Sequence, residues 1–350
     1  MKIAQVPPLI ESVPPKGYGG TERIVSYITE ELVKRGHHVT LFASGDSVTS
    51  ATLVQVCEKS LRLGRFYHEA HAFEIMQLQQ VIRHAASFDV IHFHNDYAHF
   101  PVSMAMGYAR VTTLHGRLDL PVLKKVYARF PDEPLVSISD NQRNPLPEAN
   151  WTDTVYHGLP VNLYAEGPGD GGYLAFLGRI SPEKRPDRAV EIAIRAGMPL
   201  KIAAKVDPTD IDYYNSIREK FNHPLVEFIG EIDENNKGSF LGNAAALLFP
   251  IDWPEPFGLV MIESMACGTP VIAFRNGSVP EIIDEATTGY IVETIPEAAL
   301  AAKIIGNISR HGCRKKFEER FEAGVMVTHY EKIYAALAEK KRRGKQIHLS

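Results

Sequence analysis

The strongest constraint on the fold is an alternation of short apolar runs with segments of helical periodicity along the whole chain. In residues 21–35, Ile24, Ile28 and Leu32 recur every four positions and Gly36 follows, which is typical of an amphipathic helix that ends at a glycine. Apolar runs separated by such helices predict parallel strands joined by helical crossovers. The strands expected in the first half are residues 2–6, 38–43, 90–93, 111–114 and 135–138.

A change of composition interrupts this pattern at residues 165–172, where four of the eight residues are glycine and one is proline, and we expect a domain linker there. The alternation then restarts. Further strands are expected at 173–177, 200–204, 226–229, 246–249, 271–274 and 290–292, and helices at 186–196, 258–267, 297–308 and 325–341. The sequence therefore predicts an α/β fold with two Rossmann-like, doubly wound parallel sheets that face each other across a ligand-binding cleft, in domains 1–165 and 172–324.

Composition excludes several classes of protein. The chain has 350 residues, a net charge of −4 and only three cysteines, so we expect no nucleic-acid partner, disulfide framework or zinc site. Proline interrupts the first apolar run too early for a signal peptide, and no apolar run approaches the ~20 residues that span a bilayer. A cytoplasmic location is the simplest reading. The basic tail, residues 340–345, is read as a solvated helix end, with weak peripheral contact to an anionic membrane as the alternative.

The segment 254–270, PEPFGLVMIESMACGTP, carries the clearest chemical signal. Gly258 opens an apolar helix pattern, Glu255 precedes it and Glu263 lies inside it, eight residues later. A glycine-bearing loop that enters a helix presents free amide groups and a positive dipole end, which suit a diphosphate. Carboxylates on both sides of such a site can accept hydrogen bonds from sugar hydroxyls. The alternative is that both glutamates are solvated surface residues.

A second group of candidates follows the expected strand 173–177. Arg179 and Lys184 lie in the segment GRISPEK, where both cations can converge on one anion. Lys205, after the strand 200–204, is a further candidate cation. Asp210 and Asp212 form an Asp-x-Asp pattern, but at the start of a helical segment they are ordinary cap and first-turn residues.

The first half contributes weaker candidates. Gly19 and Gly20 follow the first strand in GYGGTE, which is not a dinucleotide fingerprint and otherwise reads as a helix cap before Glu22. His115 ends the strand 111–114 and is otherwise a structural histidine. In the segment HFHND, residues 92–96, we prefer a polar cluster on the acceptor side, with His94 and Asp96, to a metal site.

Together these segments resemble the family 4 glycosyltransferases, which have the two-domain GT-B fold. The phrase EPFGLVMIESMACGTPVIA matches the family's Glu-(seven residues)-Glu signature almost residue for residue. The segments FLGRISPEKRP, SVPEII, VPPKGYGGTER and TLHG extend the resemblance over most of the chain. The resemblance implies a retaining enzyme that transfers a hexosyl group from a nucleotide-sugar co-substrate, needs no other cofactor or metal, and packs residues 325–350 against the first domain.

The resemblance also implies roles for individual residues. Glu255 would hold hydroxyls of the transferred sugar and Glu263 those of the ribose, while Arg179 and Lys184 bind the diphosphate. The amides of Phe257, Gly258, Leu259 and Val260 would contact sugar and phosphate, the Gly19–Gly20 loop would face the phosphates, and His115 would bond the sugar near the reacting carbon. Glu22 would lie near the acceptor. The sequence KIAAKVDP departs from the family, which often has a glycine-rich turn there.

The residues do not determine the identity of the donor or of the acceptor. A UDP-sugar is the first expectation and GDP-mannose the second, and the acceptor is a saccharide, a lipid-linked saccharide or a small molecule. A sugar-nucleotide epimerase and a non-catalytic nucleotide-sugar-binding protein are the alternatives on the same fold, whereas a glycan phosphorylase would need a much longer chain.

Overall fold

The computed structural model describes residues 1–350 except 18, 63–66 and 348–350, and it describes no side chains for residues 67 and 342–347. The chain divides into two compact units. The first contains residues 1–158 and 323–350, and the second contains residues 159–322. Each is a parallel sheet with helices packed on it, so the expected fold class of two Rossmann-like α/β domains is confirmed.

The first unit has a sheet of seven parallel strands in the order β3-β2-β1-β4-β5-β6-β7. The strands are β1 (Lys2–Val6), β2 (His38–Ser44), β3 (Thr52–Cys57), β4 (Val90–Phe93), β5 (Arg110–Thr113), β6 (Leu135–Ser137) and β7 (Trp151–Thr154). The sequence pattern does not predict β3 or β7. Both are partly exposed edge strands, so they do not show the continuous apolar runs that mark the central strands.

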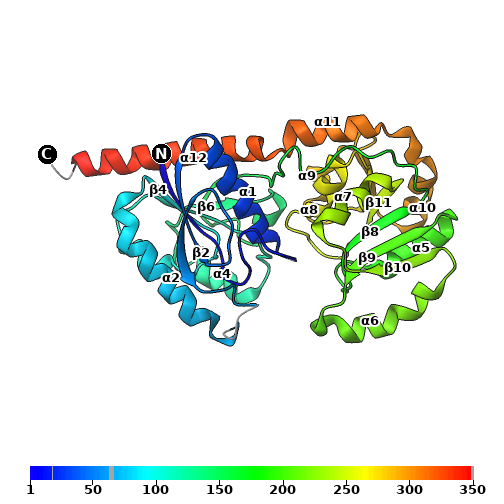
Figure 1. The fold of residues 1–350 in the computed structure, drawn as a ribbon, viewed down its shortest axis with the longest axis horizontal. Coiled ribbons are helices and arrows are strands. Elements are labelled where there is room, and N and C mark those ends of the chain that lie inside the picture. Colours follow the sequence, from blue (N-terminus) through cyan, green and yellow to red (C-terminus); the bar gives the residue numbers. More distant parts are fainter. Residues whose placement is uncertain (18, 63–66, 348–350) are drawn as a thin grey trace. The chain divides into compact units, whose positions relative to one another are not determined.

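Helices cover this sheet (Figure 1). They are α1 (Gly20–Lys34), α2 (Ala70–His84), α3 (Phe100–Met104), α4 (Pro121–Tyr127) and α12 (Ala323–Ile347). The buried face of α1 carries Ile24, Ile28 and Leu32, the residues whose spacing predicts the helix.

Helix α12 packs against α1 and β4 although nearly the whole chain separates it from them. Its buried Tyr334 hydroxyl bonds Nδ1 of His92 at 2.6 Å, and its Tyr330 hydroxyl bonds Oγ1 of Thr113 at 3.0 Å. His92 also bonds Thr113 through Nε2, so it is a structural histidine of the interior and not part of a polar cluster at the strand end.

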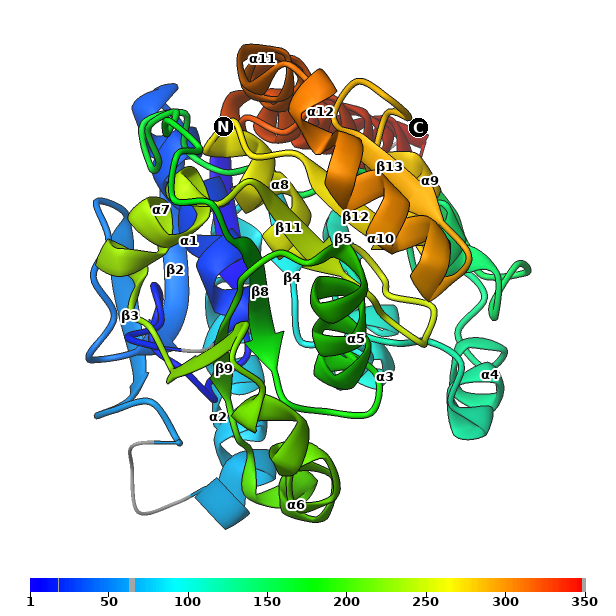
Figure 2. The ribbon, with the colours of Figure 1, turned by 90° about the vertical axis from the view of Figure 1, so that its right-hand side faces the viewer.

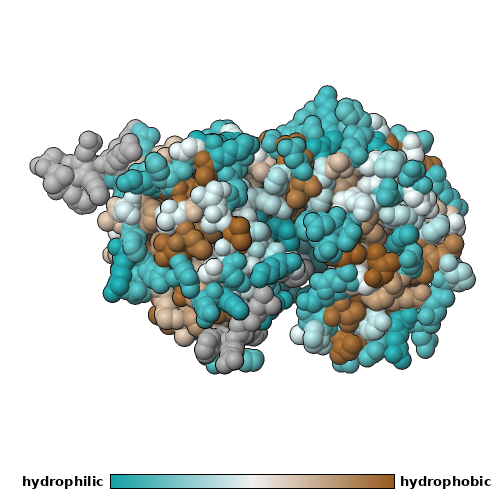
Figure 3. Space-filling model, viewed as in Figure 1, coloured by the Kyte–Doolittle hydropathy of each residue, from teal (hydrophilic) through white to brown (hydrophobic). Residues whose placement is uncertain are grey.

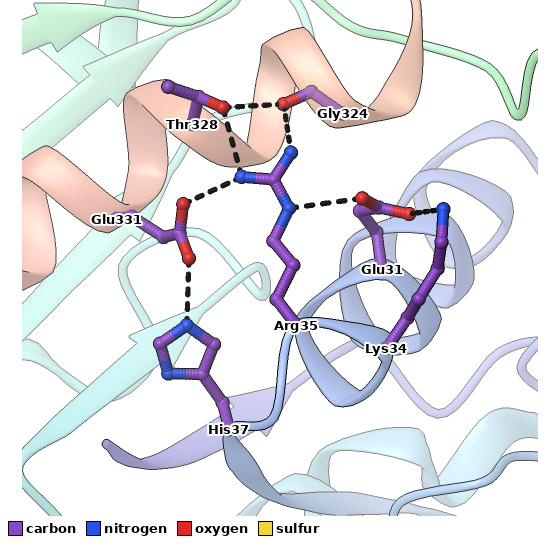
Figure 4. Close-up of polar contacts among 7 residues, drawn as sticks. All are labelled: Glu31, Lys34, Arg35, His37, Gly324, Thr328 and Glu331. Atoms are coloured by element: carbon purple, nitrogen blue, oxygen red, sulfur yellow. Dashed lines mark hydrogen bonds and ion pairs between the residues drawn. The ribbon is translucent and has the colours of Figure 1, made fainter.

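Ion pairs at the surface also hold α12 against the end of α1 and the start of β2 (Figure 4). Arg35, just after α1, bonds Glu331 at 2.7 Å, the hydroxyl of Thr328 at 2.9 Å and the carbonyl of Gly324 at 2.6 Å. Nε2 of His37 lies 2.8 Å from the other Glu331 oxygen. One guanidinium therefore joins the end of α1 to the first three turns of α12.

The second unit has a sheet of six parallel strands in the order β10-β9-β8-β11-β12-β13. The strands are β8 (Leu174–Arg179), β9 (Leu200–Lys205), β10 (Val226–Gly230), β11 (Ala246–Phe249), β12 (Val271–Phe274) and β13 (Gly289–Val292). The helices are α5 (Pro186–Ala196), α6 (Ile211–Ile217), α7 (Glu234–Asn243), α8 (Leu259–Ala266), α9 (Val279–Ile282), α10 (Ile295–Ile304) and α11 (Arg310–Arg320). Figure 2 shows α5 beside α10, which it contacts.

The glycine-rich segment 165–172 is packed into the second unit, whereas its composition predicts a linker there. The amide of Gly167 bonds the carbonyl of Cys267 at 3.0 Å, and the amide of Gly169 bonds that of Gly242 at 2.9 Å. A Cβ atom on Gly167 would lie 2.3 Å from the Gly242 carbonyl oxygen. These glycines therefore permit close backbone packing, and the chain passes between the units at residues 158–159 and 322–323.

Arg310, at the start of α11, forms hydrogen bonds with several backbone segments that meet here. Its guanidinium donates to the carbonyls of Gly167, Gly242, Ala244 and Cys267 and to the Thr269 hydroxyl, at 2.6–3.2 Å. We expect Arg310→Ala to lower the free energy of unfolding of the second unit by about 3 kcal/mol or more, because several buried acceptors lose their donor.

Urea unfolding in a Trp151→Phe background, followed by the fluorescence of Trp253, would measure this loss. Arg275→Ala is the matched control, because Arg275 forms an exposed pair with Glu293 and should change stability by less than about 1 kcal/mol. Equal losses in both variants would contradict the role assigned to Arg310.

The surface view in Figure 3 shows hydrophobic side chains interspersed with hydrophilic ones on each unit. No helix among the described residues is long and apolar enough to cross a membrane. The side chains of residues 342–345, for which membrane contact is the alternative expectation, lie outside the described part of the chain, while Lys341 bonds the carbonyl of Phe88 in the first unit at 3.3 Å.

Candidate functional site

The strand order of the second sheet creates a switch point between β8 and β11. The chain builds the sheet outward from β8 through β9 to β10, and then returns to place β11 on the other side of β8. Crossovers leave such neighbours in opposite directions, so a crevice opens at their carboxyl ends, where open α/β sheets bind ligands. Arg179 ends β8 and Phe249 ends β11, so both candidate segments of this unit leave the sheet here.

The loops after β8 and β11 meet through Lys184 and Glu255. The Lys184 ammonium forms an ion pair and hydrogen bond with Oε2 of Glu255, and the same oxygen accepts a bond from Nε1 of Trp253 at 2.8 Å. The ammonium also lies 5.6 Å from the centre of the Phe249 ring and 5.5 Å from that of Trp253. Glu255 is only 9% exposed, so the reading of a solvated surface glutamate does not hold.

Backbone contacts hold these two loops together. The amide of Asp252 bonds the carbonyl of Glu183 at 2.9 Å, and Nη1 of Arg185 bonds the Asp252 carboxylate at 2.7 Å. Arg185 has a φ of 53° at the start of α5, a strained backbone for a residue with a side chain. Motif matching does not identify Asp252 and Arg185, although both fix where Lys184 meets Glu255.

A third loop supports Glu255 from the side of β12. Ser278 donates its amide to the Glu255 carbonyl at 3.0 Å and its hydroxyl to the Phe257 carbonyl at 2.8 Å. Gly277 has a φ of 55°, and a Cβ there would lie 2.3 Å from the Glu255 amide nitrogen. Ser278, the first residue of the segment SVPEII, therefore supports the loop that carries Glu255.

Gly258 turns the chain into α8 with a φ of 81° and ψ of 67°, and no side chain caps the helix. The first amides of α8, those of Leu259 and Val260, thus begin a helix whose N-terminal donors are open to an anion. The Phe257 side chain is buried against Phe321, so only its backbone can take part. Gly258 packs on the same Phe249 ring that Lys184 approaches, so the two features lie close together.

Arg179 and Lys205 occupy adjacent positions at the ends of β8 and β9. Nε of Arg179 lies 3.1 Å from Oδ2 of Asp210, and its Nη2 lies 3.9 Å from Glu183. Asp210 directly precedes α6 and its side chain forms no capping bond, so its carboxylate serves the pair with Arg179 and not the cap expected from sequence. Lys205 Nζ lies 4.0 Å from Asp207.

Glu263 lies inside α8 with 5% of its surface exposed, and its Oε1 lies 2.8 Å from the ammonium of Lys237 in α7. A solvated Glu263 is therefore excluded. The sequence does not identify Lys237 as a candidate, because it lies in the polar segment DENNKGS, which matches no motif.

The first unit has its own switch point between β1 and β4, and the candidate histidines follow the strands beside it. Nδ1 of His94, just after β4, lies 2.9 Å from Nε2 of His115, just after β5, and Nε2 of His94 lies 2.8 Å from Oε1 of Gln5. Burial lowers the pKa of His115 to about 3, so its ring is neutral near pH 7. Its Nδ1 atom is buried without a hydrogen-bond partner in the described structure, and its ring stacks on His157.

The other candidates of the first unit are spread more widely. Gly19 precedes α1 and lies so close to Pro15 that a Cβ would approach within 2.8 Å, while Gly20 is the first residue of the helix. Glu22 is buried, which raises its pKa, and it accepts the Glu11 amide at 3.3 Å. Asp96 is exposed with a φ of 53°. Tyr18, between the glycines, lies outside the described residues.

Across residues 1–350 without the gaps named above, no three or more His, Cys, Asp or Glu side chains are grouped to hold a metal ion. The two sites thus consist of fixed cations, buried carboxylates, helix amides and neutral histidines.

Comparison with known proteins shows the family of the chain. Residues 166–322 match the family model described as glycosyl transferases group 1, and residues 18–145 match the model described as glycosyltransferase family 4. An uncharacterised glycosyltransferase of Methanocaldococcus jannaschii is 26% identical over 305 residues, which cover 79% of this chain and 84% of that protein. A phosphatidyl-myo-inositol mannosyltransferase of Mycolicibacterium smegmatis is 25% identical over an alignment of 370 positions, which covers 95% of this chain and 89% of the relative.

Solved structures share the fold. The sucrose-phosphate synthase of Thermosynechococcus elongatus superposes with a TM-score of 0.78 at 17% identity, over 96% of this chain and 99% of its own. HepE of Anabaena, in complex with UDP and glucose, superposes with a TM-score of 0.69 at 18% identity, over 96% and 100%. The chain therefore belongs to the family 4 glycosyltransferases and is a glycosyltransferase with the two-domain GT-B fold.

Proposed function

We propose that the chain transfers a hexosyl group from a nucleoside-diphosphate sugar to a saccharide, lipid-linked or small-molecule acceptor, with retention of anomeric configuration. The Lys184–Glu255 pair at the switch point of the second sheet is the observation that carries the proposal. The complex of HepE with UDP and glucose supports a nucleotide-sugar donor, and a UDP-sugar is our first expectation and GDP-mannose the second.

The second unit would bind the donor. Arg179, Lys184 and the first amides of α8 supply positive charge for the diphosphate, so departure of the leaving group is stabilised without a metal. Glu255, held by Lys184 and Trp253, accepts hydrogen bonds from hydroxyls of the transferred sugar. When the diphosphate arrives, it competes with Asp210 for Arg179.

The first unit would contribute His115, whose neutral ring can donate or accept a hydrogen bond to the sugar but cannot act as a cationic acid near pH 7. The loop at Gly19 and Gly20 and the start of α1 would approach the phosphates, and Glu22, His94 and Asp96 would serve the acceptor. Retention then follows from front-face attack, with the departing diphosphate taking the proton of the acceptor hydroxyl.

Binding is tested first with a Trp151→Phe variant, in which Trp253 is the remaining tryptophan and lies against Lys184 and Glu255. We expect UDP, GDP or ADP to change its fluorescence at micromolar concentration, whereas UMP and orthophosphate bind far more weakly. Nucleotide release from a panel of UDP-, GDP- and ADP-sugars, with and without acceptors, then tests transfer, and the anomeric proton coupling of the product tests retention.

Three outcomes would reject the proposal. No diphosphate binds, an inverted product forms, or the sugar changes its configuration without any acceptor. The last outcome would instead establish an epimerase.

A further inference from the structure

Lys237 lies between two carboxylates and is partly buried in the second unit. Its ammonium is 2.8 Å from Oε1 of Glu263 in α8 and 3.2 Å from Oε2 of Glu234, one turn before it in α7. The other oxygen of Glu234 accepts the Tyr164 hydroxyl. A single ammonium thus serves two carboxylates, and the group keeps a net negative charge.

Glu263 has little access to water, so its charge must be compensated by its partner, Lys237. A buried carboxylate that loses its cation leaves an uncompensated charge and changes either its protonation or its position. Lys237 takes Oε1, and no described residue bonds Oε2. The second oxygen therefore remains an acceptor for a hydroxyl donor, and the pair fixes the direction in which it points.

From this geometry we propose that Lys237 is a positioning residue that gives the enzyme its preference for ribonucleotide over deoxyribonucleotide donors, acting through Glu263. The proposal rests on the proposed function, in which Glu263 receives the ribose hydroxyls. A hydrogen bond from a hydroxyl to a charged group favours the ribonucleotide by roughly tenfold or more. Without Lys237 that bond loses its fixed acceptor.

The structure indicates that Lys237 can be replaced without unfolding the unit. The C-terminal half of α7 is held separately by the Tyr173 hydroxyl on the Phe240 carbonyl and by the Thr269 hydroxyl on the Leu241 carbonyl, both at 2.7 Å. Lys237→Met keeps an unbranched side chain that lacks only the terminal ammonium, and so removes the charge. Lys237→Gln is measured in parallel so that the test does not depend on one variant. Lys237→Arg restores the charge.

The experiment measures dissociation constants of the full chain for UDP, GDP and ADP, and for the 2′,3′-dideoxy form of the one that binds best. We expect the wild type to prefer the ribonucleotide by tenfold or more, and Lys237→Met and Lys237→Gln to reduce that preference to below about threefold. Lys237→Arg should restore most of it. In turnover, the two neutral variants should raise KM for the donor at least tenfold while kcat changes less than threefold.

Lys220→Met is the matched control, because Lys220 forms a half-exposed pair with Glu191 in the same unit and should leave the preference unchanged. The inference is overturned if the neutral variants keep the wild-type preference, or if the wild type binds the diphosphate without any preference for ribose. Failure of the wild type to bind any diphosphate overturns the proposed function together with the inference, so the two failures are distinguishable.

Discussion

Lys184→Ala is expected to lower kcat for sugar transfer by roughly 10²–10³-fold while the second unit stays folded. The lysine supplies a fixed positive charge where the leaving diphosphate gains negative charge, and its removal takes that stabilisation from the transition state. It also leaves Glu255, a largely buried carboxylate, with Trp253 as its hydrogen-bond partner. The sugar hydroxyls then meet an acceptor whose position is no longer fixed.

Glu255→Gln tests the other half of the pair and should also reduce kcat by orders of magnitude, because the amide keeps the shape but loses the charge that holds Lys184. Lys220→Ala, which breaks the Lys220–Glu191 pair, should leave kcat within about twofold. Initial rates of nucleotide release measure the effect, and thermal unfolding shows that the variants are folded. Near wild-type turnover of Lys184→Ala would show that the phosphate site lies elsewhere.

Acid is expected to unfold the first unit well before the second. Burial lowers the pKa of His92, His94, His99 and His157 well below the ordinary value, and that of His115 to about 3. These rings stay neutral in the folded unit, but in the unfolded chain they take up protons below pH 6.5. The unfolded state therefore binds more protons, and stability falls as the pH drops from about 6.5 toward the folded pKa values.

Each such histidine contributes up to about 1.4 kcal/mol per pH unit, so the free energy of unfolding of the first unit should fall by roughly 4 kcal/mol or more between pH 7 and pH 5. The two tryptophans allow each unit to be observed separately, because Trp151 lies in the first and Trp253 in the second. Urea unfolding of Trp253→Phe reports the first unit, and that of Trp151→Phe reports the second.

Single replacements separate this mechanism from general acid sensitivity. His94→Gln should make the dependence of the first unit on pH shallower, because one buried titrating group is lost. His71→Asn should not, because His71 is 84% exposed. If Trp151 and Trp253 report the same pH dependence, the buried histidines are not its cause.

The central strands and the main helices could be predicted because their apolar periodicity is a local property of the chain. The strand Ala246–Phe249 and the helix opened by Gly258 are examples. The edge strands Thr52–Cys57 and Trp151–Thr154 could not, because partial exposure removes the apolar run. The glycines of residues 165–172 predict a linker, but the structure packs them into the second unit. Composition does not distinguish a flexible linker from a backbone that must pack closely against Gly242.

The sequence by itself determined the class of the protein and the residue types of its candidate site. The spacing of Glu255 and Glu263 around a helix start and the cations Arg179 and Lys184 of the segment GRISPEK are local features of the chain. Only the tertiary structure decided which partners these residues have. The partnerships of Lys184 with Glu255, Lys237 with Glu263 and Tyr334 with His92 join residues 71, 26 and 242 positions apart. The order of the strands and the packing of the helices set those pairings, and no local pattern of the chain encodes them.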